Sequence, residues 1–96
     1  MVVGCLRMRV RVRGSASLKE KRMVVKSLKD RLAHRFNASV AEVGDLDSLQ
    51  LSTLGAAMTG NDSAYVEGAL ARMVDFARLS EAELLDHRIE VFPWEG

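Results

Sequence analysis

Four arginines stand at alternate positions near the N-terminus of the chain. Side chains two residues apart in an extended strand point to the same side and lie about 7 Å apart, so four of them form a row of about 20 Å. A row of guanidinium groups is suited to binding the phosphates of a nucleic acid or another polyanion. We refer to this set as the arginine stripe: Arg7, Arg9, Arg11 and Arg13.

A second group of cations follows at steps of three and four residues, a spacing that lines one side of a helix. A charged helix side is often only a solvated surface, so a solvated face and a binding surface both remain open here. This group, the basic helix side, comprises Lys19, Arg22, Lys26 and Lys29.

The turn between the two groups is a candidate anion-binding site. Free backbone N–H groups at the start of a helix attract anions, and basic side chains nearby add to the attraction. The residues predicted for this site are Ser15, Ser17 and Lys21.

The charges are unevenly distributed along the chain. Residues 1–35 hold eleven of the fourteen Lys and Arg residues and only two acids, which gives +9, while the remaining 61 residues carry −8. An asymmetry of this kind indicates a polyanionic partner, self-association or internal pairing.

Several other kinds of chemistry lack a signal. No nucleophile motif, phosphate-binding loop or dinucleotide fingerprint occurs, so we predict no catalytic residues and no cofactor. His34, His87 and Cys5 stand apart without ligand-like spacing, so we predict no metal site. No apolar run could cross a bilayer and no signal-peptide pattern is seen, which predicts a cytoplasmic protein with no membrane partner.

The first half of the chain predicts two strands around one helix. Apolar and basic residues alternate over residues 2–12, which is typical of a strand with one buried face. Ser17 and Glu20 have the spacing of a capping box, so a helix should begin at Ser17 and end near Phe36. A strand should follow over residues 37–44. Its valines, Val40 and Val43, fall on opposite faces, and either a bulge or a strongly twisted end would reconcile them.

The second half predicts a strand, a helix and a strand. Residues 51–59 should bury Leu54, Ala56 and Met58. The last strand, residues 84–92, should place Leu85, Ile89 and Val91 on one face and Asp86, Arg88 and Glu90 on the other. Between them a helix should bury an apolar side formed by Tyr65, Val66, Ala69, Leu70, Met73, Val74 and Ala77.

The order β-α-β-β-α-β predicts an α+β, ferredoxin-like fold in one domain spanning residues 1–96: a four-stranded antiparallel sheet with two helices on one face. The first strand is then central, and the arginine stripe lies on the open face of the sheet. The third strand contributes small residues there, and Asp86 and Glu90 could pair with two of the arginines. A partly paired, solvated face and a binding surface therefore both remain open.

Several segments, in the same order over nearly the whole chain, resemble the YlxP-like family of small bacterial proteins of unknown function. The resemblance implies a ferredoxin-like fold. It also implies a role near RNA or the ribosome, because the family is often encoded beside translation factors such as initiation factor 2. The first strand of that family mixes apolar, acidic and basic residues, so the arginine stripe is a departure. The segments are Ser17-Leu18-Lys19-Glu20-Lys21-Arg22, Arg35-Phe36-Asn37, Val40-Ala41-Glu42-Val43 and Thr53-Leu54-Gly55.

The sequence thus favours a non-enzymatic domain that associates with RNA or the ribosome through the arginine stripe and the basic helix side. RNA-recognition domains of this fold stack bases on aromatic residues of the central strands, where this chain has arginines. One alternative is a homodimer or protein-interaction module that uses the sheet face or a sheet edge. Another is a weak acylphosphatase-like enzyme, although the Gly14-Ser15-Ala16-Ser17 loop lacks the arginine usual in such enzymes.

Overall fold

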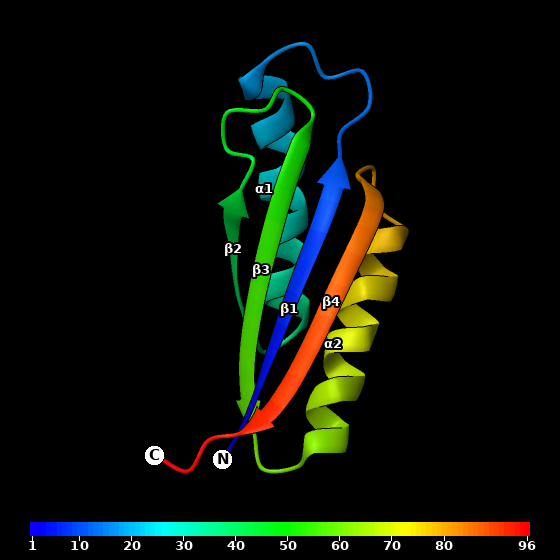
Figure 1. The fold of residues 1–96 in the computed structure, drawn as a ribbon. Coiled ribbons are helices and arrows are strands. Elements are labelled where there is room, and N and C mark those ends of the chain that lie inside the picture. The colour runs from blue at the N-terminus through cyan, green and yellow to red at the C-terminus, as the bar shows by residue number, and fades with distance from the viewer.

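The alternating N-terminal segment forms the centre of the sheet. The computed structural model describes residues 1–96, and strand β1 (Val2–Arg11) runs between β3 (Leu51–Gly60) and β4 (Glu83–Pro93) (Figure 1). The shorter strand β2 (Ser39–Gly44) lies beside β3 at one edge. All neighbouring strands are antiparallel. The central position predicted for the first strand is therefore confirmed.

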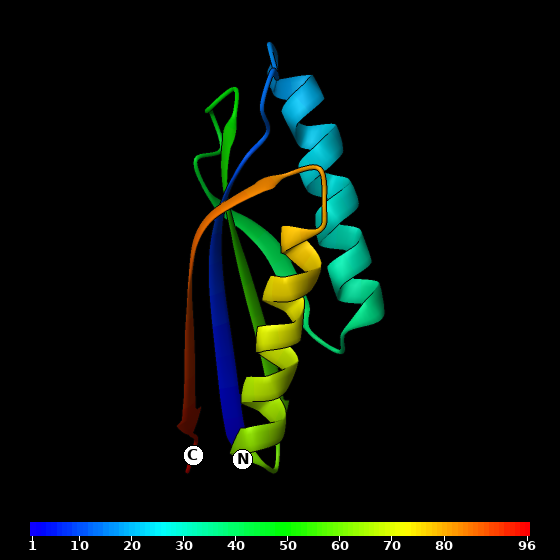
Figure 2. The same cartoon turned by 90° about the vertical axis from the view of Figure 1, so that its right-hand side faces the viewer.

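Two helices, α1 (Leu18–Arg35) and α2 (Ser63–Arg78), cover one face of the sheet and leave the other open (Figure 2). Helix α1 begins after Ser17, whose Oγ accepts a hydrogen bond from the backbone N–H of Glu20 at 3.1 Å. Helix α2 begins after Asp62, whose carboxylate accepts the N–H two residues further on. This is the predicted ferredoxin-like α+β fold. Neither helix has the length and apolarity needed to span a membrane.

The core lies between the sheet and the helices and contains seventeen buried apolar side chains. It includes nearly all residues predicted to face inward. Alternate residues of each strand and one side of each helix point into the same layer between the sheet and the helices. From the strands these are Leu6, Met8, Val10, Val12, Leu54, Ala56 and Met58, and from the helices Val25, Leu28, Leu32, Val66, Ala69, Leu70, Met73, Val74 and Ala77.

Gly4 sets how closely α2 approaches β1. A Cβ at this position would lie 2.8 Å from Leu70 Cδ1 and closer still to Val66 Cγ1. A side chain at this position would have to displace the side chains of Val66 and Leu70 or the helix that carries them. The missing side chain therefore lets α2 rest directly on the central strand.

The bulge predicted in the second strand is present. The register between β2 and β3 shifts between Glu42 and Gly44, so Val43 is the extra residue. Val40 packs against the core from the inner face, whereas Val43 is 59% exposed on the outer face. The irregularity is therefore present, but it does not bring the two valines onto one face as expected.

Two residues predicted to face the core do not. The register between β1 and β4 also shifts, because Arg9 lies opposite Asp86 while Val10 lies opposite Leu84. Leu85 is the extra residue and is exposed, and Leu84 packs against the core in its place. Tyr65, in the first turn of α2, is 62% exposed. The expectation for Leu85 assumed an unbroken last strand, and that assumption was wrong. In the first turn of α2 only Val66 is buried, and Tyr65 lies outside the buried side of the helix.

Candidate nucleic-acid interface

The arginine stripe lies on the open face of the sheet, as predicted. Figure 1 looks onto this face, with both helices behind the strands. Arg7, Arg9 and Arg11 alternate along β1 with core residues, and Arg13 follows the end of the strand. The neighbouring strand β3 contributes small side chains and leaves the arginines standing above it: Thr53, Gly55, Ala57 and Thr59.

Arg9 lies between two carboxylates. Its Nη1 is 3.6 Å from Asp86 Oδ2 on β4, and its Nε is 4.0 Å from Asp45 Oδ2 in the loop after β2. The hydroxyl of Thr53 also donates to Asp45 Oδ2, at 2.8 Å. The charge of Arg9 is thus largely balanced within the protein.

Arg13 forms an ion pair with a single acid, Glu83. Its Nη2 donates a hydrogen bond to Glu83 Oε1 at 3.1 Å, and its Nε lies 2.5 Å from Oε2. This hydrogen bond, together with the attraction between the charges, lowers the pKa of the Glu83 carboxyl and raises the pKa of Arg13. Arg13 is therefore part of an ion pair that closes the end of the sheet.

Arg7 and Arg11 have no carboxylate within 4.0 Å. The expected neutralisation by Asp86 and Glu90 is half correct, because Asp86 pairs with Arg9 but Glu90 pairs with Arg88 on its own strand. The open face is consequently a mixed-charge surface and not a basic ridge. It carries five arginines, Arg7, Arg9, Arg11, Arg13 and Arg88, and four acids, Asp45, Glu83, Asp86 and Glu90.

Helix α1 carries a larger excess of unpaired positive charge. Lys26 is paired with Asp30 at 2.6 Å, and this hydrogen bond lowers the pKa of the Asp30 carboxyl. The other members of the basic helix side have no carboxylate partner, and neither do two arginines on the flank that faces α2. These five unpaired cations are Lys19, Arg22, Lys29, Arg31 and Arg35.

Lys21 lies inside the protein instead of at an anion site. Its side chain is fully buried, and its ammonium donates to the backbone carbonyls of Asp45 at 2.8 Å and Leu51 at 3.0 Å. It also lies 3.4 Å from Glu42 Oε2. Because all of its donors are used within the protein, Lys21 cannot serve an anion from solvent.

The other two residues of the predicted anion site are also engaged. Ser17 caps α1, and Ser15 is buried with its Oγ donating to the Ser17 carbonyl at 3.0 Å. The carboxylate of Glu20 accepts the N–H of Ala16 at 2.8 Å, so an internal anion already occupies the start of the helix. The three predicted residues do not converge on a free anion-binding position, and that prediction is corrected.

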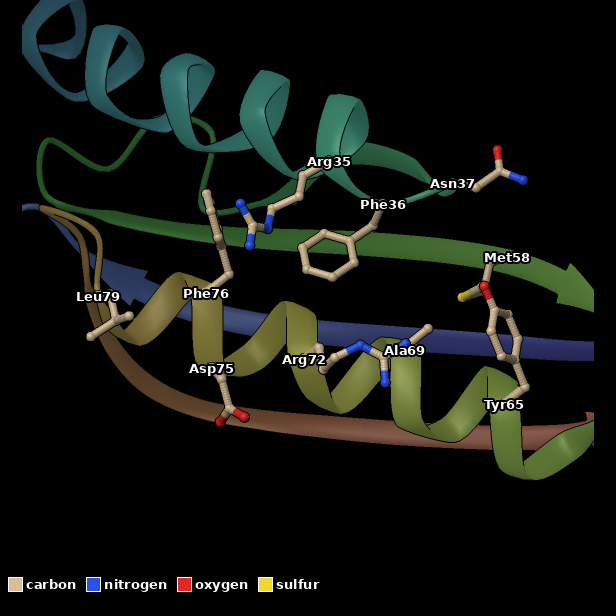
Figure 3. A pocket seen from close by; sticks show the side chains of 10 residues that line it. All are labelled: Arg35, Phe36, Asn37, Met58, Tyr65, Ala69, Arg72, Asp75, Phe76 and Leu79. Carbon is tan, nitrogen blue, oxygen red and sulfur yellow. The ribbon is translucent and has the colours of Figure 1, made fainter.

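A groove of about 480 Å³ opens between the C-terminal end of α1 and helix α2 (Figure 3). Phe36, Met58 and Phe76 contribute apolar surface, and Tyr65 rises from the first turn of α2 toward Met58. Arg35 lines the groove from α1, and Arg72 lines it from α2. Aromatic rings and unpaired guanidinium groups therefore meet in one concave site.

The Phe76 ring organises the α1 side of this groove. The Phe36 and Phe76 rings meet edge to face, with centroids 6.1 Å apart and planes at 81°. The guanidinium carbons of Arg35 and Arg31 lie 5.3 and 5.8 Å from the Phe76 centroid. Cation–π attraction thus positions Arg35 without the help of a carboxylate.

Comparisons with known proteins give the family. The profile described as "Protein of unknown function (DUF503)" matches residues 3–89. The chain belongs to the DUF503 family. It is similar to "Uncharacterized protein YlxP" of Bacillus subtilis (strain 168), with 36% identity over 62 residues that cover 65% of this chain and 67% of that protein. The resemblance stated from the sequence is therefore confirmed.

Among solved structures, the DUF503 chain is similar to "De novo designed protein Ferredog-Diesel". The TM-score is 0.49 at 11% identity, and the match covers 92% of this chain and 83% of the designed one.

Sequence reasoning missed the groove of this DUF503 protein. RNA-recognition domains carry their base-stacking aromatic residues in the central strands, and this chain has arginines at those positions. A signal was present, since the chain has only five aromatic residues and three of them, Phe36, Tyr65 and Phe76, line the groove. Their sequence separation concealed this, because the groove forms only when α1 and α2 lie side by side. No three His, Cys, Asp or Glu side chains converge as metal ligands.

Proposed function

We propose that this DUF503 protein is a non-enzymatic, cytoplasmic domain that binds RNA, with the ribosome as a candidate partner, and that helix α1 is its main contact surface. One observation carries the proposal: five exposed or partly exposed cations of α1 have no carboxylate partner. On the open sheet face, by contrast, only Arg7 and Arg11 are free of one.

Unpaired cations on a rigid helix are suited to phosphates. An α-helix of 18 residues is about 27 Å long, so its side chains can follow several successive phosphates of a strand. Each phosphate neutralised by Lys or Arg releases counterions, which makes such binding strongly dependent on salt. The family resemblance implies genes that lie beside translation factors in many bacteria, which is consistent with an RNA partner.

The test compares two variants that remove the same charge from different surfaces. Arg22→Gln/Lys29→Gln removes two unpaired cations from α1, and Arg7→Gln/Arg11→Gln removes two from the open sheet face. Each protein is titrated into a labelled short RNA by fluorescence anisotropy, between about 50 and 200 mM salt. We expect salt-sensitive binding, a clear loss of affinity for the α1 variant and a smaller loss for the sheet variant.

Two results would count against the proposal. Absence of RNA binding by the wild-type protein at low salt would overturn the proposed RNA binding. An equal loss for the two variants would remove the assignment to α1, because it would indicate general charge attraction without a preferred surface.

A second candidate function is self-association through the open sheet face. Balanced charges favour it, and so does a shallow hollow of about 340 Å³ above Gly55 and Ala57, bordered by Cys5 and Ala41. Two copies could pack face to face with arginines of one copy opposite acids of the other. Light scattering at high protein concentration tests this. A dimer that Ala57→Arg converts to a monomer supports it, and a monomeric wild-type protein excludes it.

A further inference from the structure

We propose that the groove between α1 and α2 binds one nucleotide of a single-stranded RNA, with its phosphate between Arg35 and Arg72 and its base against Phe36 and Tyr65. This inference rests on the proposed RNA binding. It adds that the groove holds a single nucleotide of the bound RNA.

The phosphate end is formed by two arginines without acidic partners. Stacking on Phe76, at 5.3 Å from the ring centroid, holds the Arg35 guanidinium in place and leaves its in-plane N–H donors unused. Arg72 lies back along α2 over Gly68, where a Cβ would come within 3.4 Å of its Nη1. Guanidinium groups bind phosphate through paired hydrogen bonds, so both side chains suit the same ligand group.

The charge around the groove favours an anion. Its one acidic lining residue is Asp75, and Figure 3 shows the Asp75 carboxylate pointing away from α1, on the outer side of α2. Arg31 adds a further positive charge beside Phe76. A ligand in the groove thus meets guanidinium groups on both helices and no inward-facing carboxylate.

The base end is flat and apolar. Phe36 is fixed edge-on against Phe76, Met58 lines the groove from strand β3, and the Tyr65 ring stands exposed beside it (Figure 3). Bases that leave a stack in single-stranded RNA bind on aromatic rings of this kind. A bare phosphate would use only the arginines and a neutral apolar ligand only the rings, whereas a nucleotide uses both.

The groove lies on the same helix as the contact surface proposed for α1. Arg31 and Arg35 stand on the flank of α1 that faces α2, whereas Lys19, Arg22 and Lys29 line the opposite flank, so an RNA strand that contacts both sets crosses the exposed side of the helix. The volume of about 480 Å³ lies within the range of about 300–1,000 Å³ typical of small-ligand sites.

The experiment compares oligouridylate with an abasic strand of equal length, which keeps the phosphates and lacks the bases. Tyr65→Ala should weaken oligouridylate binding by about fivefold or more and leave abasic-strand binding unchanged. Arg35→Lys keeps the positive charge but loses the planar guanidinium group, and it should lower the affinity for both the oligouridylate and the abasic strand. Arg78→Gln is the matched control, because Arg78 lies on α2 outside the groove.

The results separate this inference from the proposed function. One outcome would support RNA binding by α1 but contradict the groove: Arg22→Gln/Lys29→Gln lowers the affinity for both strands, whereas Tyr65→Ala and Arg35→Lys leave it at the wild-type value. Equal affinity of the wild-type protein for the two strands also overturns the groove. Absence of binding to either strand overturns both. Circular dichroism of each variant verifies folding, which these exposed positions should not disturb.

Discussion

The ammonium of Lys21 lies 3.4 Å from the carboxylate of Glu42, inside the protein and beneath the loop between β2 and β3. The hydroxyl of Ser52 donates to the same carboxylate at 2.7 Å, and the carbonyls of Asp45 in the loop and Leu51 at the start of β3 accept from the ammonium. A single side chain from α1 thus ties together the helix, strand β2 and the loop. The most deeply buried charge of the chain is structural.

We predict that Lys21→Met strongly destabilises the protein. The substitution leaves the Glu42 carboxylate without its cation and removes the hydrogen bonds from the ammonium to the carbonyls of Asp45 and Leu51. Loss of one partner from a buried pair lowers the free energy of unfolding by about 3 kcal/mol or more. Urea unfolding followed by circular dichroism measures the change.

The double variant Lys21→Met/Glu42→Gln is the control. Because Gln carries no charge, the double variant should be less destabilised than the sum of the two single variants. Strictly additive effects would contradict the assignment of Lys21 and Glu42 as a coupled pair.

The close approach of α2 to β1 predicts that Gly4→Ala destabilises the fold. The new methyl group would meet Val66 and Leu70, and overpacking of this kind lowers stability by about 1–3 kcal/mol. Cys5→Ala, at the next position and on the open face, should leave the unfolding midpoint nearly unchanged. Similar midpoints for both variants would show that the helix can move aside at little expense.

The lowered pKa of Glu83 predicts a stability contribution that disappears in acid. The hydrogen bond from Arg13 holds the folded-state pKa below the ordinary 4.5, so the unfolded chain binds this proton more tightly than the folded one. The contribution is complete above about pH 4.5 and is lost as the pH falls through the folded-state pKa. Glu83→Gln should therefore lower the urea midpoint at neutral pH, and the gap should close in acid. The same substitution at Glu81, which forms no ion pair, should produce no such gap.

Arg7 offers a substitution expected to increase stability. It lies directly opposite Arg88 across the β1–β4 ladder and has no acidic partner. Arg7→Glu replaces a like-charge pair with an opposite-charge pair, which should stabilise the protein by about 0.5 kcal/mol. Thermal unfolding at low salt measures the gain, and high salt should reduce it. A loss of stability would indicate that the like charges opposite each other are harmless here.

The fold could be predicted from the sequence because its signals are local. Alternation over residues 2–12 and the cap at Ser17 each depend on residues close together in the chain. The bulge at Leu85 could not be predicted in this way. It leaves the alternation of Asp86, Arg88 and Glu90 intact and becomes evident only when β4 is aligned with β1.

The candidate site was harder to predict because charge partners come from distant segments. The sequence predicts Lys21 at an anion-binding site, because nothing in its spacing shows that the loop after β2 covers it. Asp86 and Glu83 on β4 and Asp45 in the loop after β2 pair with Arg9 and Arg13 and leave Arg7 without a carboxylate partner. Spacing along the chain shows which face carries a side chain, but not whether an opposite charge lies across from it.

The bulges at Val43 and Leu85 lie on the two outer strands of the sheet. Outer strands with unpaired N–H and C=O groups are templates on which other chains can add as further strands, the first step toward fibres and aggregates. An extra residue twists such a strand and interrupts the regular row of hydrogen-bonding groups. The charged side chains of β4 further oppose flat stacking of copies. These two irregularities would thus help to keep the protein dispersed at high concentration.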